Sequence, residues 1–177
     1  MTAAAAATCL PVTAKYTFSP NAFNVGNKLL IHADGFISCV VTTPGTARFD
    51  VRLGSTVIYD SGPINLNIVA KVTLPFWFDA TLTCRAVGTS GNFLGSGRFT
   101  SEAVIGSPLG TVGGGGTILS DVSGGVDTAL TNPGGTVGAN VDLTVANAFD
   151  LFFTQTVATG SLQVLQFYML GLAMAYP

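Results

Sequence analysis

The fold is decided by a stretch that spans residues 48–59 and reads RFDVRLGSTVIY. Its first half alternates strictly, because charged side chains separate the apolar residues Phe49, Val51 and Leu53. Successive side chains of a β-strand point to opposite faces, so this alternation is typical of a half-buried strand. A Gly-Ser pair then turns the chain into a second apolar run. We therefore predict a β-hairpin with one apolar face and one charged face.

Short apolar runs of the same kind recur along the chain, separated by many of its 22 glycines and 8 prolines. No helical pattern with caps interrupts them. One run is broken at Asp34-Gly35, so it is either two strands or one strand bent at a bulge. This spacing predicts an all-β fold, a jelly-roll-like antiparallel β-sandwich of about ten strands. The predicted strands are Lys28–Val41, Arg48–Leu53, Thr56–Tyr59, Ile64–Leu74, Ala80–Val87, Asn92–Thr100, Thr117–Val122, Val126–Thr131, Gly138–Val145, Ala148–Val157 and Ser161–Leu172.

The domain organisation depends on a glycine-rich segment at residues 101–116. This segment either divides two domains or forms a long crossover within one jelly roll. We favour the crossover, because the last strands are so apolar that they need a partner sheet. The alanine run near the start is too short to nucleate an independent helix. We therefore predict an N-terminal arm at residues 1–24 and a single β-sandwich domain at residues 25–177.

Charged residues are scarce, since 7 basic and 9 acidic side chains make up 9% of a chain that is 48% hydrophobic. An ordinary soluble domain carries about a quarter charged residues, so we expect other subunits to cover part of the surface. All seven basic residues precede position 99, and five of the nine acidic residues follow it. This segregation is either chance or a sign of complementary faces that meet between subunits.

The net charge of −2 is too small to indicate nucleic acid or an anionic membrane as a partner. Residues 151–177 carry no charge, but their most apolar part is shorter than the roughly 20 residues of a spanning helix. We expect a buried final strand there. The cysteines Cys9, Cys39 and Cys84 lack metal-ligand spacing and suit a reducing cytoplasm. We expect the last two to be small core side chains.

The sequence holds no convincing catalytic or cofactor motif. The only histidine, His32, lies in an apolar run, so we interpret it as a structural residue. A run of four glycines lacks the Gly-Lys-Ser/Thr of a phosphate loop. No spacing supports Asp60 with Asp79, or Asp121 with Asp127, as a glycosidase pair, and the second pair is at most a weak calcium site. We expect no enzyme activity, cofactor or metal.

The aromatic residues supply a candidate subunit interface. In Phe76-Trp77-Phe78, alternation places Trp77 on the face opposite to its two neighbours. An exposed Trp77 could anchor a subunit contact or stack on a sugar. The contact is favoured, because no flanking set of polar residues indicates a carbohydrate groove. Adjacent aromatics in the last strands must point opposite ways, so either both faces are covered or one is an intersubunit surface. The candidate interface residues are Trp77, Phe149, Phe152, Phe153, Phe167 and Tyr168.

The segment Trp77–Phe99 resembles a recurring segment in structural proteins of tailed bacteriophages. In those proteins a strand of the type Leu-Thr-x-Arg is followed by x-Gly-Thr-Ser-Gly and by a strand that ends Gly-x-Phe. The corresponding parts here are Leu82–Arg85, Val87–Gly91 and Gly97–Phe99. Residues 52–58 likewise resemble the Arg-Leu-Gly-Gly-Thr-Val hairpin of that family. The resemblance covers residues 25–172 and implies a jelly-roll-like sandwich, commonly a trimer, with no catalytic residues.

The resemblance and the scarcity of charge predict a non-enzymatic virion structural protein that is made in the host cytoplasm. The favoured role is a homotrimeric capsid decoration or cement protein, bound to the major capsid protein or another virion protein. A phage fibre, neck or tail module with the same fold is one alternative. A carbohydrate- or receptor-binding jelly roll is another. Neither nucleic acid nor membrane is expected as a partner.

Overall fold

The computed structural model describes residues 5–39, 45–67, 69–103, 116–121, 140–156 and 161–172. These ranges contain eleven strands, one short 3-10 helix and no α-helix, which confirms the all-β prediction. The elements in chain order are β1 (Ala7–Thr8), η1 (Val12–Ala14), β2 (Thr17–Phe18), β3 (Lys28–Cys39), β4 (Thr46–Leu53), β5 (Thr56–Asp60), β6 (Ile64–Asn65), β7 (Lys71–Ala86), β8 (Asn92–Ser101), β9 (Gly116–Asp121), β10 (Asn147–Gln155) and β11 (Ser161–Leu172).

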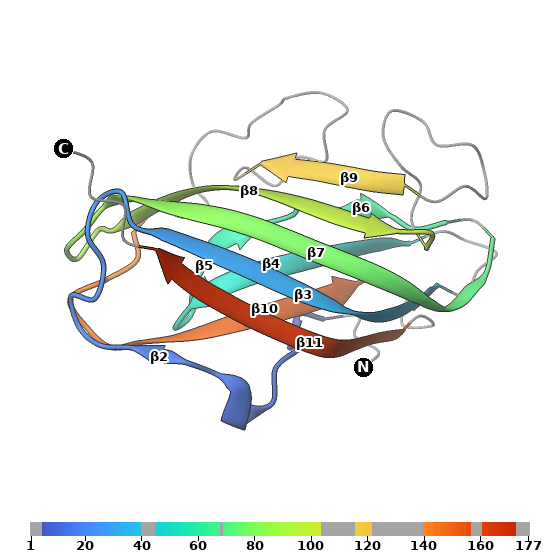
Figure 1. The fold of residues 1–177 in the computed structure, drawn as a ribbon, viewed down its shortest axis with the longest axis horizontal. Coiled ribbons are helices and arrows are strands. Elements are labelled where there is room, and N and C mark those ends of the chain that lie inside the picture. The colour runs from blue at the N-terminus through green and yellow to red at the C-terminus, as the bar shows by residue number, and fades with distance from the viewer. Residues whose placement is uncertain are drawn as a thin grey trace.

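The strands form two antiparallel sheets that stack as a sandwich (Figure 1). One sheet has five strands in the order β11-β3-β7-β8-β9. The other has six strands, with the order β1-β10-β4-β5 and with β2 on β10 and β6 on β4. β3 pairs with β11 in the first sheet, and β4 pairs with β10 in the second. Strands from the beginning and the end of the chain therefore pair in both layers.

The core lies between the sheets and is built largely from phenylalanine. Phe49 of β4 has no exposed surface, and its ring stacks on that of Phe78 of β7, with 4.9 Å between centroids. Phe99 and Phe153 complete the cluster, at 5.1 and 5.2 Å from Phe49. Aromatic pairs at such distances add to the free energy of burial. The inward face predicted from the alternation in β4 is confirmed.

The described N-terminal residues are part of the sandwich, which corrects the prediction of an arm at residues 1–24 over its described part, residues 5–24. β1 and β2 both pair with β10, and the side chains of Leu10 and Phe23 belong to the core. The backbone N–H of Cys9 also donates to the carbonyl of Leu151, at 2.8 Å. Alternation could not reveal this pairing, because each of these strands has only two residues.

Several predicted strands have different limits in the structure, and the strand predicted at Ala80–Val87 is part of a longer strand, β7, that runs from Lys71 to Ala86. β3 runs without a break through Asp34 and Gly35, and the irregularity lies opposite them, between Val164 and Gln166 of β11. The predicted strand Ile64–Leu74 is instead split into β6 and the start of β7. The predicted limits of β11 are confirmed, and so is the hairpin turn, where Gly54 has a positive φ of 59°.

The predicted strand Gly138–Val145 is wrong over its described part. Residues 140–146 form a turn, with one isolated bridge between Val141 and Gly91. The carboxylate of Asp142 accepts hydrogen bonds from the backbone N–H and the hydroxyl of Thr144, at 2.9 and 2.6 Å. Such a side-chain turn competes with a strand even where apolar and polar residues alternate. The predicted strand Val126–Thr131 lies outside the described residues.

Candidate functional site

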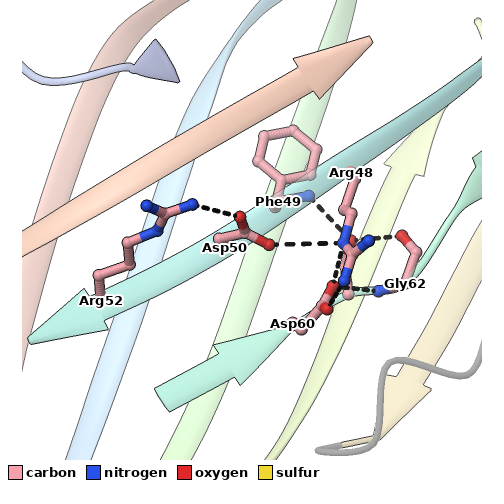
Figure 2. A network of polar contacts seen from close by, with 7 residues as sticks. Arg48, Phe49, Asp50, Arg52, Asp60 and Gly62 are labelled. Atoms are coloured by element: carbon pink, nitrogen blue, oxygen red, sulfur yellow. Dashed lines mark hydrogen bonds and ion pairs between the residues drawn. The ribbon is translucent and has the colours of Figure 1, made fainter. Parts of the chain in front are cut away.

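The charges of the six-stranded sheet form a network on its outer face, in which Asp50 Oδ1 and Arg52 Nε are buried without a hydrogen-bond partner (Figure 2). Asp50 of β4 and Asp60 of β5 lie directly opposite each other, although like charges in that position repel. Arg48 resolves the conflict, because its guanidinium contacts both carboxylates. Its Nε donates to Asp60 at 2.7 Å and lies 3.5 Å from Asp50. The Nη2 of Arg48 also contacts Asp60, and the Nη2 of Arg52 donates to Asp50 at 2.9 Å.

The carboxylates of this network are largely withdrawn from solvent, since Asp50 and Asp60 are only 7% and 4% exposed, whereas half of the Arg48 side chain is exposed. Asp60 also accepts a hydrogen bond from the backbone N–H of Gly62 at 2.8 Å. The guanidinium of Arg52 lies 3.9 Å above the ring of Phe152, a distance suited to a cation–π contact. Buried charges of this kind need partners for each ion. The contacts fit a structural role better than a ligand site.

The N-terminal segment extends the network along β10. The carboxylate of Asp150 is 2.6 Å from the ammonium of Lys15 and accepts a hydrogen bond from the hydroxyl of Thr8 at 2.6 Å. Burial and the charge of Asp150 raise the pKa of the Cys9 thiol to about 12. Cys9 is therefore protonated at neutral pH and is a poor nucleophile. Here a basic residue of the first half meets an acidic residue of the second half within one chain.

The outer face of the five-stranded sheet is more open. Phe76 and Phe78 are buried at 0% and 1% exposure, whereas Trp77 between them is 47% exposed, which confirms the predicted alternation. In the register, Trp77 lies between Asp34 of β3 and Thr100 of β8. Directly opposite residues have Cβ atoms roughly 5 Å apart. Polar residues therefore flank Trp77, contrary to the sequence-based reasoning against a carbohydrate surface.

The next row of the same face contains His32, Asp79 and Arg98, one from each of the three neighbouring strands. The Nδ1 of His32 is 2.7 Å from one oxygen of Asp79, and the Nη2 of Arg98 donates to the other at 3.0 Å. Desolvation raises the pKa of Asp79, but the hydrogen bonds from His32 and Arg98 outweigh it and lower the pKa below its usual value. His32 is thus a structural residue of this row, and its Nε2 also lies 3.4 Å from Asp34.

The predicted interface residues do not form one surface. Phe149 and Phe153 are 1% and 0% exposed within the single chain, so the prediction that they line a subunit interface is corrected. They point inward from β10, and of the three phenylalanines on this strand only Phe152 points outward, where the guanidinium of Arg52 lies over its ring. Trp77 is exposed on the other sheet. The predicted contacts at Phe167 and Tyr168 lie on β11, whose side chains are outside the described part of the structure.

The carboxylates considered for catalysis or metal binding are not gathered together. Asp60 and Asp79 belong to different sheets and point away from each other, on opposite outer faces. Asp127 lies outside the described residues. Over the described ranges, no group of three or more His, Cys, Asp or Glu side chains could hold a metal ion. Cys39 and Cys84, at 1% and 0% exposure, are core residues as predicted.

The chain was compared with known proteins at the levels of family, sequence and structure. No protein-family model, curated protein or solved structure matches it. Within the described residues, no helix is long and apolar enough to cross a membrane.

Proposed function

We propose that the chain is a non-enzymatic structural subunit of a bacteriophage particle. In this proposal it is a capsid decoration protein that assembles as a homotrimer of jelly-roll-like sandwiches on the major capsid protein. A fibre, neck or tail module would use the same features. The resemblance of residues 77–99 to phage structural proteins supports a role in a phage particle. One feature of the fold supports the assembly of several copies of the chain.

That feature is the edge strand β11. It extends over twelve residues, Ser161–Leu172, without one charged residue or proline. β3 pairs with one side of it, and among the described residues no strand pairs with its other side. An exposed strand edge is a template for pairing with another chain, and monomeric proteins usually protect it with charges, prolines or short length. A long uncharged edge is therefore better suited to a subunit that meets a second copy of itself.

The symmetry of the assembly decides what β11 meets. Two β11 strands that pair with each other would give a twofold dimer, because each subunit then uses the same surface. A trimer needs a heterologous contact, in which β11 of one subunit lies against a different surface of the next. The proposed homotrimer therefore commits β11 to the second kind of contact. Its mass in solution would be three times the chain mass of 18.1 kDa.

The role in a particle is tested by quantitative mass spectrometry of purified phage particles that encode this chain. Hundreds of copies per particle are expected for a decoration protein. A handful of copies per particle would instead indicate a fibre, neck or tail module. Absence of the chain from the purified particles would overturn the proposal of a virion protein altogether.

The assembly is tested with a charge on the edge strand. We expect Gln166→Lys to shift the trimer toward monomers in native mass spectrometry and light scattering, because an edge lysine opposes strand pairing. Position 166 lies opposite Asp34 in the register of β11 and β3. The matched control is Thr81→Lys, which adds the same charge to the central strand β7. A wild-type monomer, or equal dissociation of both variants, would contradict assembly through β11.

A further inference from the structure

The outer face around Trp77 has the composition of a ligand site, and the phage assembly proposed above does not use it. We propose that this face binds a neutral sugar residue of a glycan, with the indole of Trp77 as the stacking surface. The face consists of Trp77 and Thr100 with Asp34, and of the neighbouring row His32, Asp79 and Arg98. This inference does not rest on the proposed virion function.

The aromatic part of the face is a single flat surface. The Trp77 side chain is 47% exposed on a regular stretch of β7, with Phe76 and Phe78 fixed in the core on either side. The backbone at position 77 is therefore held rigidly, and an indole that keeps half of its surface in water has apolar area available to a ligand. The C–H side of a pyranose ring is also flat and apolar, and its stacking on an indole removes both surfaces from water.

The polar part of the face lies where the hydroxyl groups of such a sugar would be. Asp79 is fixed by His32 on one side and by Arg98 on the other, at 2.7 and 3.0 Å. Its carboxylate is nevertheless 39% exposed, and the side chain of Arg98 is 58% exposed. An acceptor and a donor thus stand one row from Trp77 in fixed positions. A few placed polar groups beside an apolar surface are what orient a small ligand.

The charges of the face favour a neutral ligand. It has two carboxylates, Asp34 and Asp79, against one arginine and one histidine. The negative charges therefore equal or exceed the positive ones in either state of His32. A sugar with a carboxylate or sulfate group would meet no excess of positive charge. A neutral hexose or N-acetylhexosamine would leave the ion pairs in place and exchange hydrogen bonds with their exposed sides.

The same charges argue against a protein as the occupant. The centre of a protein interface is depleted in charged residues, whereas four ionisable side chains lie within one row of Trp77. β3 also separates β7 from the uncharged edge strand β11. A contact through β11 can therefore leave the Trp77 face open to solvent.

The test starts with a glycan array that carries neutral hexose, N-acetylhexosamine and sialic acid termini. We expect binding to a subset of the neutral glycans. Each bound glycan is then titrated in solution while tryptophan emission is followed. Trp77 is the only tryptophan of the chain, so a change in emission reports on this face alone. Binding to no glycan, or to sialylated glycans only, would overturn the proposal.

Substitutions then locate the site by calorimetry. We expect Trp77→Ala to weaken binding by about tenfold or more, as truncation of an aromatic anchor does, and Asp79→Asn to weaken it less. The matched control is Leu94→Ala, which removes a side chain of similar exposure, 46%, from the same face three rows away. Unchanged affinity of Trp77→Ala would overturn the proposal. A loss of oligomer in Trp77→Ala would also overturn it, by assigning Trp77 to a subunit contact.

Discussion

On the outer face of the six-stranded sheet, the side chains of Asp50 and Asp60 are 9% and 5% exposed, whereas on the five-stranded sheet the side chain of Asp79 remains 39% exposed. Each of these carboxylates contacts an arginine and lies on a sheet face that points away from the core. The difference comes from what surrounds the pairs. On the first face Asp60 contacts Arg48 and the N–H of Gly62, and Asp50 contacts Arg48 and Arg52, whereas the second face keeps an exposed tryptophan beside its charges.

This comparison separates two uses of a small number of charges. Where carboxylates are buried, removal of one partner leaves an ion without water or counterion, so truncation of that partner destabilises the fold. Where the ion pairs are exposed, water can replace a lost partner, so the pairs contribute little to stability. Charges that the fold does not need remain available for a ligand. Substitutions on the two faces should therefore differ in their effect on the free energy of unfolding.

The largest effect is expected from deletion of residues 1–10. The deletion removes β1, the buried side chain of Leu10, and the hydrogen bonds of Thr8 and Cys9 to β10. We expect a loss of about 3 kcal/mol in the free energy of unfolding, from apolar burial and hydrogen bonds together. Urea denaturation at one fixed protein concentration measures it. An unchanged midpoint would show that β1 contributes no stability.

A smaller effect is expected from Asp60→Ala on the outer face of the six-stranded sheet. Arg48 and the N–H of Gly62 then lose their acceptor. We expect a loss of about 2 kcal/mol, below the value for a fully buried pair, because half of the Arg48 side chain can be hydrated. The matched change on the outer face of the five-stranded sheet is Asp79→Ala. It should lower the free energy of unfolding by less than about 1 kcal/mol. Equal losses in the two variants would remove the distinction between the faces.

The local features of the fold could be predicted from the sequence, and the long-range ones could not. The hairpin at residues 48–59, the limits of β11 and the direction of Trp77 follow from alternation and turn residues within a few positions. The pairing of β1 with β10 depends on residues more than 140 positions apart. Two residues carry no periodicity, so nothing in the sequence of residues 1–24 distinguishes an arm from an edge strand.

The site could be predicted only in part, for the same reason. Alternation identified the exposed side of Trp77, but its polar neighbours Asp34 and Thr100 come from other strands, and the register that aligns them is not a local property. The prediction for Phe149 and Phe153 of β10 failed differently, because both side chains face the core of the single chain. The adjacent residues Phe152 and Phe153 do point opposite ways, but the outward one is covered by an arginine of the same chain. Two adjacent aromatic residues in a strand are therefore compatible both with a cation–π contact inside the chain and with a contact between subunits.

The smallest expected effect is a change in the pH dependence of stability, and it comes from Asp79 on the outer face of the five-stranded sheet. The pKa of Asp79 is lower in the folded chain than the ordinary value of an aspartate, because hydrogen bonds from His32 and Arg98 outweigh desolvation. A carboxyl with a lowered folded pKa stabilises the fold above its unfolded pKa and loses this contribution as the pH falls through the folded value. Asp79→Asn removes the titration. We therefore expect a shallower loss of melting temperature between about pH 5 and pH 2, worth less than about 1 kcal/mol at this exposure.

The control for this measurement is Glu102→Gln, which removes an exposed carboxylate from the turn that follows β8. Its pH profile should run closer to that of the unchanged chain than the profile of Asp79→Asn does. If the two variants gave the same slope, the row of His32, Asp79 and Arg98 would contribute nothing measurable to folding. Such a result would argue against a fixed position of Asp79, on which the proposed sugar site depends. Hydrogen bonds that hold Asp79 in place must also favour its ionised form.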